Sequence, residues 1–278
     1  MRRFLVLLCV SAVAPVLAQE RVRPVDTSAR AVLAAAASHL KAYQESLQFV
    51  LADEQTVQEV FDERDRRRAR RETSGDFFLA WVPADGGWLS VRDITKVDGK
   101  PVEAGEDLRG LLNRGSMASI GRAMADRNAR YNIGVVTRNF NEPMFALMIL
   151  DAKHQSRFRF ERKAIERGDA GTSVTLAFTE RNRPTLVQAA SGGPVFTSGE
   201  LVLDAATGRL QRSIVIMKDG PTTAQLTTTF AENKKLALWL PATMQERYTH
   251  ASPRLKELVV VESTYTNYRQ FEVTARIR

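Results

Sequence analysis

The chain has 278 residues, of which 44% are hydrophobic and 26% are charged. These proportions exclude a disordered chain, a coiled coil and a collagen-like fibre. The formal net charge is +8, and the sequence contains one cysteine and three histidines, which leaves little material for a disulfide framework or a metal cluster. We therefore expect no metal and no cofactor.

The first eighteen residues have the pattern of an export signal. Two arginines precede an apolar run from Phe4 to Val16, and a Val-Leu-Ala triplet suited to cleavage ends at Ala18. Because this run is too short to cross a bilayer as a helix, we expect residues 1–18 to be removed, with a retained anchor as the alternative. The mature chain would then be exported, periplasmic or extracellular, and would lack Cys9, the single cysteine.

The segment that follows predicts one long helix. Residues 19–26 form a polar leader, and Asp26, Thr27 or Ser28 can cap a helix start. Apolar residues then recur at intervals of three and four, which indicates an amphipathic helix of about twenty residues. Its apolar stripe contains Leu33, Ala36, Leu40, Tyr43 and Leu47.

After residue 48 the apolar period changes to two, which predicts about three strands up to residue 102. A turn at Asp98-Gly99 follows the last of them. The alternating residues of these strands are Val57, Glu59 and Phe61, then Phe77, Leu79 and Trp81, then Leu89, Val91 and Val97.

Six arginines crowd residues 64–71, and five of them are candidates for contact with an anionic surface. An exported protein has little occasion to meet nucleic acid, so lipid headgroups or envelope polymers would be the target, with peripheral membrane contact as the result. The favoured alternative is a solvated loop or edge strand whose charge discourages pairing with other sheets. The five candidates are Arg66, Arg67, Arg68, Arg70 and Arg71.

Residues 103–153 read as a helical insert. One predicted helical face carries Met117, Ile120 and Met124, and the segment from Met144 to Leu150 is the most apolar of the mature chain. Flexible, polarisable methionines suit variable hydrophobic ligands. The same residues would equally fill an ordinary core, which is the favoured interpretation.

From Ser156 to the end almost every segment alternates as a strand, with a turn roughly every ten residues. An antiparallel sheet of this size curls because strand twist accumulates. We therefore expect a mainly β (α+β) fold: a strongly curved antiparallel sheet or unclosed β-barrel, with the N-terminal helix and the helical insert packed on its concave face. Residues 27–278 are expected to form a single domain.

The sequence shows no catalytic motif. It has no Gly-x-Ser-x-Gly elbow, phosphate loop or His-Glu-x-x-His, and its histidines (His39, His154 and His250) lack metal-ligand spacing. We predict a non-enzymatic protein with no catalytic residue; a hydrolase whose residues meet only on folding is the least favoured alternative.

Residues 93–112 resemble the strand, turn and helix of a PDZ domain, which would imply binding of peptide C-termini by strand addition. They lack a carboxylate-binding loop. The simpler interpretation is a hairpin strand, an Asp-Gly turn and a short helix.

The segment Gly199 to Leu210, with its Asp-Ala-Ala-Thr-Gly turn, precedes two strands and the sequence Leu240-Pro241-Ala242-Thr243-Met244. This order is similar to that of the lipoprotein-carrier superfamily (LolA/LolB-like outer-membrane lipoprotein-sorting proteins) over roughly residues 199–278. The whole mature chain also resembles a group of secreted proteins from soil bacteria, a resemblance that implies no function. The residues that carry this second resemblance are Trp88, Val97 to Val102, Ala129 to Gly134 and Thr264 to Phe271.

The carrier resemblance implies an incomplete barrel wrapped around helices that holds an acyl chain or senses a lipoprotein. We accordingly expect a non-enzymatic extracytoplasmic protein that binds an apolar ligand, a lipid or a lipidated protein. The alternative is an envelope module for protein–protein interaction or regulation. Candidate ligand-binding residues of an apolar cavity are Leu33, Leu40, Met117, Met124, Met144, Phe145 and Met148.

Overall fold

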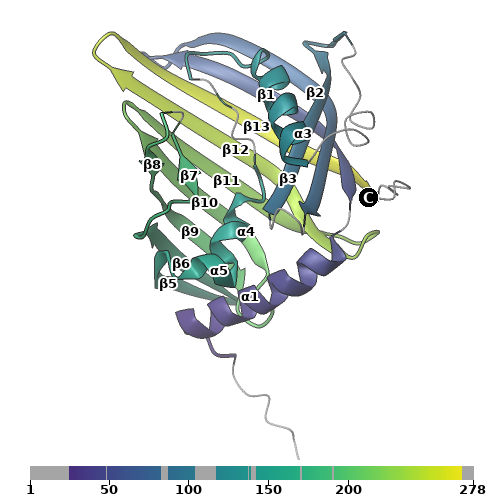
Figure 1. Cartoon of the computed structure of the whole chain (residues 1–278), viewed down its shortest axis with the longest axis vertical. Coiled ribbons are helices and arrows are strands. Elements are labelled where there is room, and N and C mark those ends of the chain that lie inside the picture. The colour runs from purple at the N-terminus through teal and green to yellow at the C-terminus, as the bar shows by residue number, and fades with distance from the viewer. Residues whose placement is uncertain are drawn as a thin grey trace, which may run out of the picture.

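A computed structural model describes residues 25–47, 49–82, 87–103, 117–136, 138, 142–169, 171–189 and 191–270. The expected export signal and all but the last two residues of the polar leader lie outside this part. Eleven described strands form one antiparallel sheet in the order β4-β3-β2-β1-β13-β12-β11-β10-β9-β6-β5 (Figure 1). β4 and β5 stand at its two edges, so the sheet is curved but not closed, as the sequence predicts.

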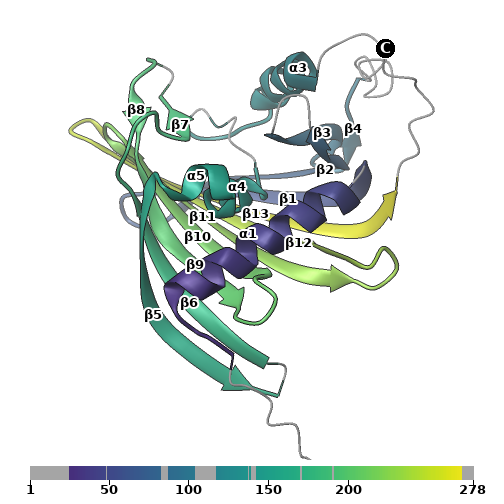
Figure 2. The same ribbon diagram turned by 60° about the horizontal axis from the view of Figure 1, so that its bottom comes forward.

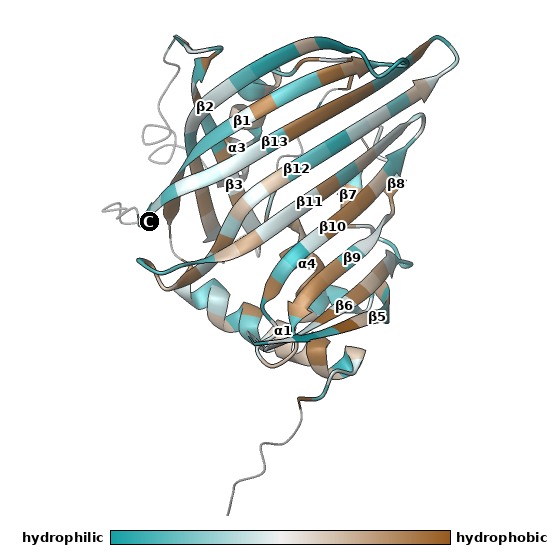
Figure 3. Ribbon diagram, turned by 180° about the vertical axis from the view of Figure 1, so that it is seen from behind, coloured by the Kyte–Doolittle hydropathy of each residue, from teal (hydrophilic) through white to brown (hydrophobic). Residues whose placement is uncertain are grey.

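The sheet strands are β1 (Val50–Asp62), β2 (Arg67–Val82), β3 (Gly87–Val97), β4 (Lys100–Pro101), β5 (Phe158–Gly168), β6 (Gly171–Glu180), β9 (Thr197–Asp204), β10 (Leu210–Asp219), β11 (Thr222–Asn233), β12 (Leu238–Ser252) and β13 (Leu255–Gln270). A separate two-stranded ribbon contains β7 (Val187–Gln188) and β8 (Pro194–Val195). The helices are α1 (Ala29–Ser46), α3 (Met117–Ala129), α4 (Phe145–Leu150) and α5 (Ala152–Gln155). Seen from behind, many strands are banded brown and teal, as expected where only one face of a strand is apolar (Figure 3).

Helix α1 begins where the sequence predicts. The Ala31 amide donates to the Ser28 hydroxyl at 3.2 Å, which satisfies one free N–H of the first turn. The helix lies along the concave face (Figure 2), and Val32, Leu40 and Tyr43 are buried there. Leu33 is only half-buried, because the buried stripe passes through its neighbour Val32.

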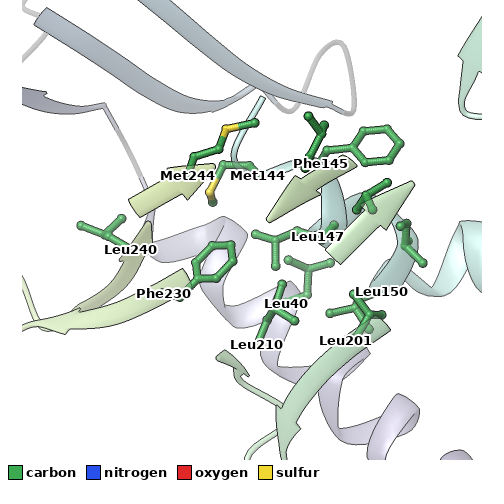
Figure 4. Packing of buried hydrophobic residues seen from close by; sticks show 14 of the residues in the cluster. Leu40, Met144, Phe145, Leu147, Leu150, Leu201, Leu210, Phe230, Leu240 and Met244 are labelled. Atoms are coloured by element: carbon green, nitrogen blue, oxygen red, sulfur yellow. The ribbon is translucent and has the colours of Figure 1, made fainter. Parts of the chain in front are cut away.

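Helix α4 forms the centre of the core. Met144 and Phe145 are 0% and 3% exposed, so both have the core role favoured by the sequence. Fully burying a side chain of this size contributes ~1.5–3 kcal/mol relative to leaving it exposed. Around α4 the apolar side chains of helix α1 and of the sheet converge (Figure 4): Leu40, Leu201, Leu210, Phe230, Leu240 and Met244.

The hairpin that carries the lipoprotein-carrier resemblance is present. β9 and β10 pair across a turn in which the Asp204 carboxylate accepts the Thr207 amide at 2.7 Å. Gly208 follows with a φ of +72°, and a Cβ built on it would lie 2.2 Å from the Ala36 nitrogen of α1. Only glycine lets the turn approach the helix so closely.

The helical insert does not lie wholly on the concave face as expected. Ile120 and Met124 of α3 pack on Phe78 and Leu89 in a separate cluster. Phe78 alternates along β2 with Phe77, which belongs to the main core, so α3 covers the opposite face of the sheet beside β3. The reason is that the residues on this face of β3, Leu89 and Val91, are apolar, so packing α3 on them removes them from water.

The predicted inward face of β1 also differs from the observed one. In β1 the buried side chains include Glu54, Thr56 and Gln58, whereas the Val57-Glu59-Phe61 face is only half-buried. In β10 a bulge between Leu210 and Arg212 shifts the alternation, so that Ser213, Val215 and Met217 are the buried residues after it. None of the described helices is long and apolar enough to cross a bilayer.

Candidate functional site

A cavity with a volume of about 700 Å³ lies between the concave face of β10–β12, helix α3 and the β7–β8 ribbon. Val135 and Val136, in the loop after α3, complete its wall. The sheet places its residues in register: Met217 pairs with Ala224, and Ala224 pairs with Tyr248. Cross-strand partners share a face, so these three side chains form one continuous floor.

The walls of this cavity are mainly apolar. Its polar residues are exposed, as in Arg122 and Asp219, or half-buried, as in Thr222 and His250. Thr222 Oγ1 lies 3.0 Å from His250 Nδ1, so these two groups satisfy each other. The arrangement can hold a hydrocarbon inside and a polar group near the opening. The apolar walls are formed by Val135, Val136, Val187, Val195, Met217, Ala224 and the ring of Tyr248.

The candidate residues named from sequence do not line this cavity. Met124, Phe145 and Met148 border a second cavity of about 280 Å³ between α3, α4 and β3. Leu40 borders a void of about 10 Å³, too small for a ligand. Leu33 packs on the core, and Met144 is part of it. The side chain of Met117 lies outside the described residues.

Sequence reasoning missed the lining residues because they are scattered over six elements and the loop after α3. The one available signal was the inward alternation of β11 and β12, which pairs small Ala224 with large Tyr248. Recognising a cavity there requires the strand register and the place of α3, and neither follows from periodicity alone.

A buried polar network crosses the concave face beside the two cavities. Arg92 Nε donates to Glu54 Oε1 at 2.6 Å, and Arg92 Nη2 donates to the Tyr265 hydroxyl at 3.3 Å. Tyr248 Oη donates to Glu246 Oε2 at 2.5 Å. Arg138 donates to the Ile133 carbonyl at 2.8 Å and lies over the Tyr248 ring.

Two carboxyls of this region are shifted toward the neutral form. Burial raises the pKa of Glu142 to about 7, against the opposing effect of a 2.5 Å hydrogen bond from Ser90 Oγ. Burial likewise raises the pKa of Glu246, although Arg92 and Arg138 oppose that shift. Glu246 Oε1 has no hydrogen-bond partner among the described residues. The network is therefore sensitive to protonation.

The five candidate arginines lie just before or at the start of β2, beyond the last β3 pairing at Thr73: Arg66 precedes the strand and the other four lie in it. All five form ion pairs with acidic neighbours. Arg66 and Arg68 pair with Asp62 at 2.9 and 2.7 Å, and Arg67 pairs with Glu59 at 2.7 Å. Their charge is thus partly neutralised at an exposed strand extension, an arrangement that fits the solvated interpretation.

The described part of the PDZ-like segment is the end of β3, a turn at Asp98-Gly99 and the two residues of β4. Both turn residues have positive φ, as a tight hairpin requires. Residues 104–112 lie outside the described part. Within the described residues, no group of three or more His, Cys, Asp and Glu side chains is arranged to hold a metal ion.

No protein-family model matches the chain, and no curated protein matches it. An outer membrane lipoprotein-sorting protein domain from Vibrio parahaemolyticus is 12% identical, with 88% of this chain and 94% of that chain covered and a TM-score of 0.38. A DUF1329 family protein from Desulfovibrio piger is 11% identical, with 88% and 95% covered and a TM-score of 0.37. The MucA/MucB complex of Pseudomonas aeruginosa gives 12% identity, 86% and 99% covered, and a TM-score of 0.19.

The TM-scores of these three structures are all below 0.5, so we infer the function from the geometry of the cavity alone.

Proposed function

We propose that this protein acts outside the cytoplasm as a non-enzymatic binder of an apolar ligand, a lipid or acyl chain or the lipid group of a lipoprotein. The observation that supports it is the cavity of about 700 Å³ with apolar walls on the concave face. Its volume falls within the range of about 300–1,000 Å³ found for small-molecule sites. Each buried CH₂ contributes ~0.8 kcal/mol, so a chain of ten carbons gains enough for stable binding.

The polar residues of the cavity would contact the ligand's polar end. Arg122, Gln188 and His250 can donate to a carboxylate or phosphate there, while Asp126 and Asp219 disfavour a second negative charge. The proposed pose therefore has the hydrocarbon against Met217 and Ala224 and its headgroup toward α3 and the β10–β11 turn.

The test is native mass spectrometry, with lipid extraction, of the mature protein purified from a bacterial envelope. Ala224→Phe fills the cavity, since Ala224 is half-buried and faces it. Ala231→Phe makes the same change at an exposed position of the same strand that does not line the cavity. We expect near-stoichiometric lipid on the wild type and on Ala231→Phe, and its loss from Ala224→Phe.

Two outcomes would contradict the proposal. One is a ligand-free wild-type protein that captures peptides ending in a free carboxylate, which would favour an interaction module instead. The other is equal lipid content in both phenylalanine variants, which would place the lipid elsewhere on the surface.

A further inference from the structure

Three hairpin tips and one loop gather at the end of the sheet where the large cavity opens. The register brings the β10–β11 tip at Thr222 beside His250, and the β12–β13 tip beside the β1–β2 tip through the pair Asp62 and Glu257. Figure 1 shows the long hairpins projecting at this same end. We call residues 62–66, 133–136, 219–222 and 252–256 the mouth end, because Val135, Asp219 and Thr222 among them line the cavity.

The β1–β2 and β12–β13 tips carry an excess of positive charge, because the five cations that line the groove between them outnumber its two carboxylates, Asp62 and Glu63. Arg64, Arg254 and Lys256 are exposed and form no ion pair with any described residue, so their charges are free. Arg66 and Arg68 share the single carboxylate of Asp62. Exposed pairs of this kind contribute little to stability and can exchange for an external anion. The β1–β2 and β12–β13 tips also enclose a groove of about 450 Å³ that these five cations line.

Exposed apolar side chains lie among these charges. Val135 is 50% exposed and Leu255 is 40% exposed, which makes them two of the four large hydrophobic residues exposed in the described part of the chain. Val135 is held in place because its amide donates to Glu257 Oε1 at 2.7 Å. Basic residues interleaved with exposed apolar ones are typical of surfaces that lie in a membrane interface.

We propose that the mouth end docks on a bilayer containing anionic lipid, with the cavity opening against the headgroups. The free cations contact lipid phosphates, and Leu255 and Val135 enter the boundary between headgroups and acyl chains. The orientation, though not the docking surface itself, rests on the proposed function: a chain passing directly from the bilayer into the cavity avoids exposing hydrocarbon to water.

The first test is sedimentation with vesicles, using phosphatidylglycerol mixed into phosphatidylcholine and phosphatidylcholine alone. The triple variant Arg64→Glu, Arg254→Glu and Lys256→Glu is compared with Arg159→Glu, Arg167→Glu and Arg181→Glu. The control set changes the net charge equally at exposed residues in and beside β5 and β6, far across the sheet. We expect binding to the anionic vesicles only, about a hundredfold weaker for the mouth-end variant and nearly unchanged for the control.

The second test reports orientation. A chain without residues 1–18 has no cysteine, so Leu255→Cys and Gly168→Cys can each carry one environment-sensitive fluorophore. Gly168 is a suitable control because a Cβ there meets nothing within 4 Å. We expect a blue shift on anionic vesicles for the label at 255 and none for the label at 168.

Equal losses in the two charge variants, equal binding to neutral vesicles, or a blue shift at position 168 alone would overturn the docking surface. So would stronger binding to an anionic polysaccharide than to the vesicles. Lipid content of the mouth-end variant, measured by native mass spectrometry, separates this proposal from the previous one. A variant that keeps its lipid but loses vesicle binding fails only in docking, whereas an empty wild-type cavity with intact vesicle binding contradicts only the proposed function.

Discussion

Gly208 meets Ala36 so closely that a Cβ on the glycine would lie 2.2 Å from the Ala36 nitrogen. The contact joins the β9–β10 turn to helix α1, and it fixes the helix over the concave face. Because the turn is backbone packed on backbone, no rotamer change can relieve a clash there.

Gly208→Ala should therefore destabilise the fold by more than its backbone conformation alone explains. Gly220→Ala is the matched control, because Gly220 also has a positive φ (+54°) but has nothing within 4 Å of a built Cβ. We expect ~1–2 kcal/mol for Gly220→Ala from the left-handed conformation, and a clearly larger loss for Gly208→Ala. Urea unfolding measures the free energy of unfolding of both variants. Equal losses would show that the contact between the turn and α1 does not contribute to stability.

Breaking the buried ion pair should be costly. Arg92 and Glu54 are 8% and 5% exposed, so Arg92→Met leaves Glu54 as an uncompensated buried charge. We expect a loss of ~3–5 kcal/mol. The double variant Arg92→Met with Glu54→Leu should recover most of it, since the cost is the unpaired charge. A double variant less stable than the single one, by chemical denaturation, would contradict this account.

Stability should depend on pH through Glu142. Its folded pKa of about 7 exceeds its ordinary value of 4.5, so the folded state binds the extra proton between these values. The stabilisation of the folded state by this proton is fully present below pH 4.5 and is lost as the pH rises through 7. The wild type should thus weaken relative to Glu142→Gln across this window, by at most ~1.4 kcal/mol per pH unit. A constant difference between the two proteins from pH 4.5 to 7 would refute the shift.

The two cavities can be distinguished by one substitution in each. Met148 borders the smaller cavity and is half-buried, so Met148→Asp places a charge there at moderate cost to folding. If the ligand occupies the larger cavity, Met148→Asp should retain lipid whereas Ala224→Phe loses it. The reverse pattern, read by native mass spectrometry with circular dichroism as the folding control, would favour the site residues expected from sequence.

The fold was largely predictable because its signals are local. Helix α1 has a cap and a 3.6-residue period, and the strands after residue 156 alternate between clear turns. Such patterns reflect burial against a single neighbouring surface, which a sequence displays directly.

The features that the sequence did not predict depend on contacts between residues far apart in the chain. Glu54 and Gln58 are inward-facing polar residues, and their partners Arg92 and Arg138 are distant in sequence, so periodicity assigned the wrong face of β1. The bulge near Gln211 reversed the alternation of β10. The cavity depends on the space left between α3 and three strands, which no single segment encodes.

A photo-crosslinking map tests the central claim most directly. The protein is loaded with a fatty acid carrying a diazirine near its methyl end, irradiated, digested and sequenced by mass spectrometry. The account predicts adducts on the peptides containing Met217, Ala224 and Tyr248, which share the cavity floor. Adducts confined to the β5–β6 edge or to α1, or no adduct at saturating fatty acid, would contradict it.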